Sequence, residues 1–219
     1  MKITSNIYIV GGPSESHPSD AAIYLFVSGN EAALIDAGTG AGHDQVMENL
    51  ARTLTNPEQV KYLFLTHCHY DHTGGAAALR AETGCTIVTH KLSAFYLERG
   101  DPEVTAASWY RAELSPLDID NVVESTPCDF PLGDHSLTFY HTPGHSPGSS
   151  VLTVRSDGKL VLFGQDVHGP LNRTLLSSRE DYVRSLEFMI SLDADILCEG
   201  HFGVFSGREK VRQYIESYL

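Results

Sequence analysis

The chain has 219 residues, of which 42% are hydrophobic and 20% charged, so it can bury a core and is not a disordered segment. Its formal net charge of −13 repels phosphate backbones and disfavours a nucleic-acid partner. No stretch approaches the roughly 18 apolar residues that cross a bilayer, and the start, MKITSNIYIVGGP, lacks the pattern of a signal peptide. We therefore expect a soluble, cytoplasmic protein with no membrane partner.

The first third of the sequence favours short strands. Residues 7–10 form one candidate strand, and residues 60–65 form another that runs directly into a histidine-rich motif. Between them, residues 21–36 carry two apolar runs around Gly29 and Asn30, which is the pattern of a two-residue hairpin.

Helices are predicted from spacing after these strands. Val46, Leu50 and Leu54 recur at helical intervals, and Pro57 is expected to close that helix. Residues 74–81 form a second helix of small side chains that can pack closely on a sheet.

The second half begins with a less regular stretch, residues 91–118, which we expect to be mainly helical. A β-rich run follows over residues 122–163, with a hairpin turn at Asp157 and Gly158. A helix is expected to begin at Ser178, and its predicted buried residues are Val183, Leu186 and Ile190.

The last helix is predicted to open with a capping box formed by Ser206 and Glu209. The four cysteines form no C-x-x-C pair, so they are read as reduced, mostly buried thiols. The order of strands and helices, without repeats or a low-complexity linker, favours two packed sheets with helices outside. We expect a single domain over residues 1–219.

The strongest chemical signal is the motif HCHYDH at residues 67–72, which lies between a predicted strand and a predicted helix. Alternate residues of an extended segment point the same way, so His67 and His69 can reach one metal ion together. Asp71 and His72 lie at the turn and can serve a neighbouring position. Imidazole and carboxylate groups suit zinc, iron and manganese. Cys68 is expected to face away from the metals and to pack in the core.

Three further candidates lie in loops or at strand ends. His145 sits in the tight loop HTPGHSPGS, Asp166 ends an apolar strand in LVLFGQD, and His201 follows a strand in ILCEGHFG. In a packed sheet such positions can share one edge, where binding residues are usually displayed. His168, two residues beyond Asp166, is either a substrate or supporting contact or an ordinary surface histidine.

The HxHxDH signature, the PGHSPGS loop, the strand-end Asp and the final GH resemble the metallo-β-lactamase superfamily, in the arrangement of glyoxalase II-like hydrolases. The resemblance covers nearly the whole chain, including LIDAGTG near the N-terminus. It implies an α+β fold, a four-layer αββα sandwich. The first metal ion would be held by His67, His69 and His145, the second by Asp71, His72 and His201, and Asp166 would bridge both.

The resemblance also implies a mechanism with two divalent metal ions, zinc first, with iron or manganese as other suitable metals. Two cations lower the pKa of a shared water, so that a bridging hydroxide attacks the substrate. Asp71 would act catalytically by orienting the nucleophile and passing its proton to the leaving group.

Comparison within the superfamily narrows the expected activity. Two classes of the superfamily do not fit the sequence. Exported β-lactamases commonly place a cysteine at the position of Asp166, and flavodiiron proteins place a glutamate at the position of His69. Glyoxalase II usually continues after its bridging Asp with a Gly-Cys-Gly-Arg-like segment and a helical C-terminal extension, whereas this chain reads GQDVHGPLNRT. We therefore expect hydrolysis of a small ester, thioester or lactone.

Two other functions stay open. A persulfide dioxygenase shares the ligand pattern but uses a single iron, bound through the residues that match His67, His145 and Asp166. A metal-binding sensor that has kept the fold is the non-enzymatic alternative, although such a scaffold has no physical need for seven ligands.

The expected partner is a small-molecule substrate, and the oligomeric state stays open. Residues 91–118 and 167–180 are expected to form the pocket walls. Four aromatic residues are candidates for an apolar lid: Phe95, Tyr96, Trp109 and Tyr110.

Overall fold

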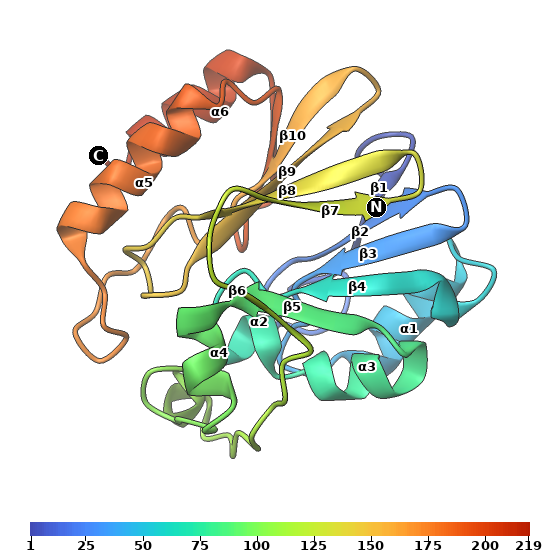
Figure 1. The fold of residues 1–219 in the computed structure, drawn as a ribbon, viewed down its shortest axis with the longest axis horizontal. Coiled ribbons are helices and arrows are strands. Elements are labelled where there is room, and N and C mark those ends of the chain that lie inside the picture. Colours follow the sequence, from blue (N-terminus) through green and yellow to red (C-terminus); the bar gives the residue numbers. More distant parts are fainter.

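The computed structural model describes residues 1–219, and it contains two packed β-sheets with helices on both outer faces (Figure 1). The strands of the first sheet are β1 (Ile7–Gly11), β2 (Ile23–Ser28), β3 (Glu31–Ile35), β4 (Val60–Phe64), β5 (Thr86–His90) and β6 (Asn121–Val123). Those of the second sheet are β7 (Cys128–Leu132), β8 (His135–His141), β9 (Ser150–Ser156), β10 (Lys159–Phe163), β11 (Ile196–Cys198) and β12 (Val204–Ser206).

The helices form the two outer layers. They are α1 (His43–Ala51), α2 (Tyr70–Thr73), α3 (Ala76–Thr83), α4 (Lys91–Leu97), α5 (Arg179–Ser191) and α6 (Arg208–Glu216), with 3₁₀ turns η1 (Pro57–Gln59) and η2 (Ala107–Tyr110). In Figure 1 α1 to α4 lie below the first sheet, while α5 and α6 cover the second. This arrangement is the expected four-layer αββα sandwich. None of the helices is both long and apolar enough to cross a membrane.

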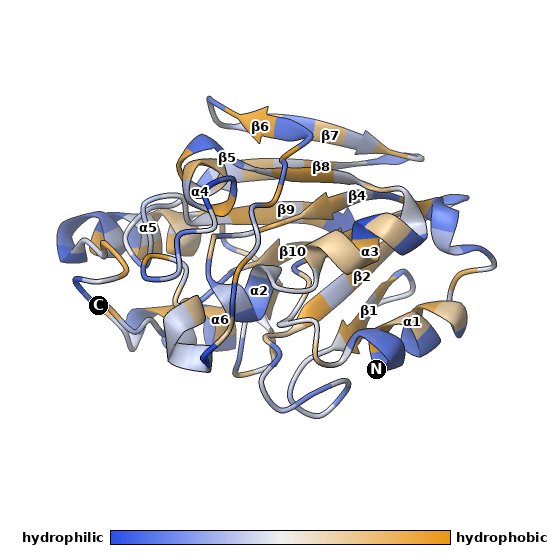
Figure 2. Ribbon diagram, turned by 90° about the horizontal axis from the view of Figure 1, so that it is seen from below, coloured by the Kyte–Doolittle hydropathy of each residue, from blue (hydrophilic) through white to orange (hydrophobic).

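Alternating side chains along the strands build the core between these layers. In β2, Ile23 and Leu25 pack toward the helices, whereas Tyr24 and Phe26 pack toward the second sheet. A third apolar cluster lies between the second sheet and α5 and α6. Figure 2 shows the hydrophobic residues concentrated on the strands, with hydrophilic residues prominent on the outer elements. Each large apolar side chain that is fully buried contributes about 1.5–3 kcal/mol.

The direction of the strands determines at which edge of the sheets the candidate site lies. In the first sheet, β3, β4, β5 and β6 run parallel, and in the second, β10 and β11 run parallel. The carboxyl ends of parallel strands face the same edge, and the loops that follow them are where open α/β sheets bind ligands. The segments after β4, β10 and β11 carry six of the seven candidate ligands, and His145 lies in the loop that joins the antiparallel strands β8 and β9.

Both expected hairpins are confirmed. Ser28 pairs with Glu31 across the first turn, and Ser156 pairs with Lys159 across the second. At the second turn, Asp157 and Gly158 both have positive φ, as a two-residue type I′ turn requires.

Several helix predictions need correction. The first helix ends at Ala51, so Leu54 lies beyond it, and Pro57 opens a 3₁₀ turn instead of closing the helix. Residues 91–118 contain only α4 and η2 and are otherwise irregular. Residues 74–81 largely coincide with α3, but the four-residue α2 was not predicted.

The C-terminal helices also differ in detail. Ser178 caps α5 as expected, but the buried face carries Tyr182 and Met189 beside Leu186, whereas Val183 and Ile190 are only half-buried. The predicted capping box is wrong, because Ser206 ends β12 and makes no cap contact with α6.

Candidate metal centre

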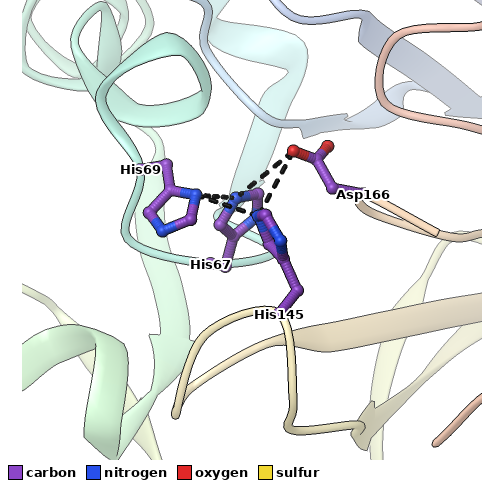
Figure 3. Close-up of side chains that lie close together, drawn as sticks. All are labelled: His67, His69, His145 and Asp166. Atoms are coloured by element: carbon purple, nitrogen blue, oxygen red, sulfur yellow. Dashed lines mark hydrogen bonds and ion pairs between the residues drawn. The ribbon is translucent and has the colours of Figure 1, made fainter. Parts of the chain in front are cut away.

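A first cluster of donor atoms lies at the edge where the two sheets meet. Nδ1 of His69 lies 3.0 Å from Nε2 of His67 and 2.9 Å from Nε2 of His145. Oδ2 of Asp166 lies 3.3 Å from Nε2 of His145 and 3.9 Å from Nε2 of His67. Figure 3 shows these four side chains converging on one small volume. All four are buried, so their donor atoms face one another and not solvent.

A second cluster lies beside the first. Nε2 of His201 is 3.3 Å from Nε2 of His72 and 3.3 Å from Oδ2 of Asp71. The other oxygen of Asp166, Oδ1, lies 3.1 Å from Nε2 of His72 and 3.4 Å from Nε2 of His201. The structure thus brings all seven predicted ligand residues together and places Asp166 between the two clusters.

Local structure explains how the 67–72 motif supplies both clusters. Residues 66–68, including His67, form a bend after β4, so the expected extended segment is found only at His69, which precedes α2. The first turn of α2 carries Asp71 and His72. The backbone N–H of Tyr70 donates to the carbonyl of Thr105 at 2.7 Å, which fixes this helix to the irregular 101–107 segment.

Gly200 allows the second sheet to approach this motif. A Cβ at position 200 would collide with Oδ1 of Asp166 and crowd the ring of His72. The close approach of the backbone to the cluster therefore requires glycine here.

Hydrogen bonds on the far side of the rings set the tautomers. Nδ1 of His145 faces the carbonyl of Pro170 at 3.0 Å, and Nδ1 of His72 faces the carboxylate of Asp36 at 2.8 Å. Neither oxygen can donate, so both Nδ1 atoms must carry the proton, and both Nε2 atoms point toward the clusters.

Nδ1 of His67 also carries the proton. Oγ1 of Thr66 donates to Oδ2 of Asp36 at 2.9 Å, so it accepts from Nδ1 of His67 at 3.1 Å. The Nε2 lone pairs of two histidines thus converge on Nδ1 of His69, whose single proton could satisfy only one of them fully. A divalent cation matches this donor set better than hydrogen bonds do, which supports the use of divalent metal at this site.

The charge state of the first cluster suits ligation. Burial, together with the neighbouring histidines, lowers the pKa of His67 well below its ordinary value and that of His69 to about 3. Both rings are therefore neutral at physiological pH, which is the form that binds metal.

The second cluster has the opposite character. Burial disfavours a charged His72, but the carboxylates of Asp166, Asp36 and Asp71 outweigh it and raise its pKa well above the ordinary value. Burial likewise opposes charge on His201, yet hydrogen bonds to Asp166 and Asp71 raise its pKa to about 10. Negative potential therefore accumulates here, and it favours a bound cation.

Two acidic residues that sequence reasoning missed support the clusters. Asp36 follows β3 with a φ of 65° and accepts hydrogen bonds from Thr66 and His72. Glu199 is fully buried, and its Oε2 accepts from the backbone N–H groups of His201 and Phe202, each at 2.7 Å. Both lie directly after an apolar strand, and Asp36 also belongs to the LIDAGTG segment that the resemblance covers.

His168 occupies a defined position. Its Nδ1 lies 2.9 Å from Oε1 of Glu199, and its ring is edge-on to the rings of His201 and Phe202. It also lines the pocket beside the clusters, so the reading as an ordinary surface histidine does not describe it.

The pocket at the two clusters has a volume of about 160 Å³. Ala106, Trp109 and Tyr110 contribute from one expected wall segment, and Pro170 and Leu175 from the other. Of the proposed lid residues, Phe95 and Tyr96 are outside this lining: Phe95 packs beneath the Arg99 guanidinium, and Tyr96 packs against the core. Cys68 belongs to the core as expected, and burial raises its pKa to about 12.

Comparison with known proteins agrees with this geometry. A family model described as the metallo-beta-lactamase superfamily matches residues 18–201. A probable metallo-hydrolase of Methanocaldococcus jannaschii is 30% identical over 126 residues, which is 58% of this chain and 58% of that protein. A hydroxyacylglutathione hydrolase of Tolumonas auensis is 28% identical over 178 residues, 81% of this chain and 59% of its own length. The chain thus spans less than two thirds of both relatives.

Among solved structures, a mutant metallo-beta-lactamase from Cronobacter sakazakii aligns with a TM-score of 0.84 at 23% identity, covering 100% of this chain and 92% of that chain. At this identity the likeness shows the fold. Together with the family match over residues 18–201, it confirms the resemblance drawn from the motifs. The chain therefore belongs to the metallo-beta-lactamase superfamily.

Proposed function

We propose that the protein is a dinuclear hydrolase of a small ester, thioester or lactone. The observation that carries the proposal is the division of the Asp166 carboxylate. One oxygen lies 3.3 Å from Nε2 of His145 in the first cluster, and the other lies 3.1 Å from Nε2 of His72 in the second. A carboxylate so placed can serve two cations side by side.

The seven side chains fit zinc, because imidazole nitrogen and carboxylate oxygen are its usual protein ligands, and iron or manganese accept the same set. When bound, two such cations supply Lewis acidity that lowers the pKa of water and polarises a carbonyl. The first ion would be held by His67, His69 and His145, the second by Asp71, His72 and His201, with Asp166 shared.

The chain's own side chains would then position the reacting groups and transfer the proton. Asp71 lines the pocket, and its Oδ2 lies 3.3 Å from Nε2 of His201. From there the carboxylate can accept a proton from the attacking water and return it to the leaving group. No cysteine competes as a nucleophile at the motif, since Cys68 lies within the core.

Pocket size and similarity support the substrate class. The 160 Å³ pocket is smaller than the roughly 300–1,000 Å³ sites that enclose drug-sized ligands, which favours a small substrate. The hydroxyacylglutathione hydrolase of Tolumonas auensis supports a thioester among the candidates. The family match over residues 18–201 also supports our expectation that residues 1–219 form one domain.

The test is metal content, measured by elemental analysis on protein purified without chelators, together with hydrolysis of a panel of small esters, thioesters and lactones. We expect two equivalents of metal per chain and turnover that Asp166→Ala abolishes. One equivalent of iron, with oxygen uptake on a persulfide and no hydrolysis, would replace this proposal with the mononuclear-iron alternative.

A further inference from the structure

One wall of the pocket is apolar, whereas most of the rest of the lining is polar. The lining includes charged or ionisable groups of the two clusters, but also Ala106, Trp109, Tyr110 and Leu175. The apolar wall contains the only tryptophan of the chain, Trp109. No lysine or arginine is among the lining residues, so this wall offers a ligand apolar and aromatic contacts.

The turn that carries the two aromatic residues is rigidly placed. Ala106 and Arg111, on either side of η2, both adopt left-handed backbone, with φ of 58° and 53°. Such conformations cost free energy in residues other than glycine and persist where surrounding contacts impose them, often at functional sites. The amide of Ala112 donates to the carbonyl of Ala107 at 3.0 Å and closes the turn.

Contacts fix this turn directly to the metal-binding motif. The ring of Tyr110 lies 5.5 Å from that of Tyr70, and the amide of Tyr70 bonds to Thr105 just before the turn. Because Tyr70 adjoins both His69 and Asp71, the aromatic wall and the proposed ligands are held as one unit.

The aromatic side chains on this wall are only partly covered by the protein, although the ring of Tyr110 packs against Tyr70. Trp109 is 50% exposed and Tyr110 is 40% exposed, although both line a pocket that reaches the buried clusters. Scattered exposed apolar residues need no explanation, but two adjoining aromatic rings at the edge of a polar centre form a surface that a ligand can cover.

We propose that Trp109 and Tyr110, with Leu175, form a subsite for an uncharged aromatic or short aliphatic arm of the substrate. The occupant is the substrate and not a protein, because the apolar wall is continuous with the pocket that holds Asp71 and His201. An arm bearing carboxylates would find no lysine or arginine on this wall to pair with. This inference rests on the proposed function and specifies its substrate class.

The single tryptophan makes binding measurable without turnover. In the metal-loaded protein, phenylacetamide should change the Trp109 fluorescence saturably, whereas acetamide at the same concentrations should not. Tyr110→Ala should weaken phenylacetamide binding by about tenfold, the effect of losing one well-packed aromatic contact. Phe95→Ala, which removes an exposed aromatic residue outside the pocket, is the matched control and should bind like the wild type.

Kinetics supply the second readout, with the ethyl thioesters of acetic and phenylacetic acid as probes. The wild type should have the larger kcat/KM for the phenylacetyl compound, mainly through a lower KM. Trp109→Ala should remove the preference, and Trp109→Phe should restore most of it. A Trp109→Ala enzyme that loses activity on both thioesters equally would assign the residue a structural role and overturn the subsite.

The two proposals fail in different ways. Saturable phenylacetamide binding that depends on Tyr110, without hydrolysis of any panel compound, would support the subsite and contradict the hydrolase. Hydrolysis with no acyl preference and no phenylacetamide binding would support the hydrolase and contradict the subsite.

Discussion

Replacing Asp36 by asparagine should weaken metal binding without unfolding the protein. Asp36 accepts from the amide of Thr66 at 2.8 Å, from the hydroxyl of Thr66 at 2.9 Å and from Nδ1 of His72 at 2.8 Å. Asparagine tolerates the φ of 65° found here, and its oxygen can keep the bond to the amide of Thr66. Its NH₂ group, however, would donate where the carboxylate accepts.

The tautomer of His72 is therefore the feature that changes. Facing an NH₂ group, Nδ1 would accept, and the proton would move to Nε2, the atom that points toward Asp166 and His201. Loss of such an outer hydrogen bond typically lowers metal affinity by about 10–100-fold, which is about 1.4–2.7 kcal/mol. We expect this loss for the ion of the second cluster.

Chelator competition measures that affinity, with circular dichroism to verify the fold. Asp20→Asn is a matched control, because Asp20 is also buried and accepts from the amide and hydroxyl of Thr39 and from Ser16, but touches none of the proposed ligands. If Asp36→Asn bound two ions as tightly as Asp20→Asn, the reasoning about the second cluster would be refuted.

Three other predictions concern packing and protonation. Gly200→Ala should lose metal, as seen by elemental analysis, because its Cβ would collide with Asp166; full metal content would contradict the close approach. Burial and the stacked ring of His141 lower the pKa of His90 to about 4. The unfolded chain, with a pKa of about 6.5, then binds the proton first, so stability is lost as pH falls from about 6.5 to about 4. Between pH 7 and pH 4.5, the free energy of unfolding measured with urea should fall less in His90→Gln than in the wild type. An equal fall in both proteins would exclude His90 as the cause. Phe139→Ala, between the sheets, should lower the free energy of unfolding by about 3–5 kcal/mol, and a loss below 1 kcal/mol in the same assay would contradict its core position.

The local sequence pattern was sufficient to predict the strands and loops that carry the ligands. The positions of His67, Asp166 and His201 just after strands could be predicted locally, because parallel strands end at a common edge. Local spacing therefore predicted two packed sheets and the candidate donors, whereas the four-layer fold and the division of the ligands into two sets came from the family resemblance.

Long-range contacts account for what could not be predicted. The roles of Asp36 and Glu199 depend on which loop lies opposite each strand end, and this is a tertiary property. Ser206 makes no cap because it ends β12, where its backbone pairs with Ile196 of β11. The buried face of α5 differs from the predicted one because it includes Tyr182, whose hydroxyl donates to the carbonyl of Val167.

The central claim is that two metal ions share the carboxylate of Asp166. The most direct test is a crystal structure of the metal-loaded protein with anomalous scattering recorded at the metal edge. We expect two peaks about 3.5–4 Å apart, one among His67, His69 and His145 and the other among Asp71, His72 and His201. A single peak in crystals of protein that hydrolyses its substrate would contradict the dinuclear account.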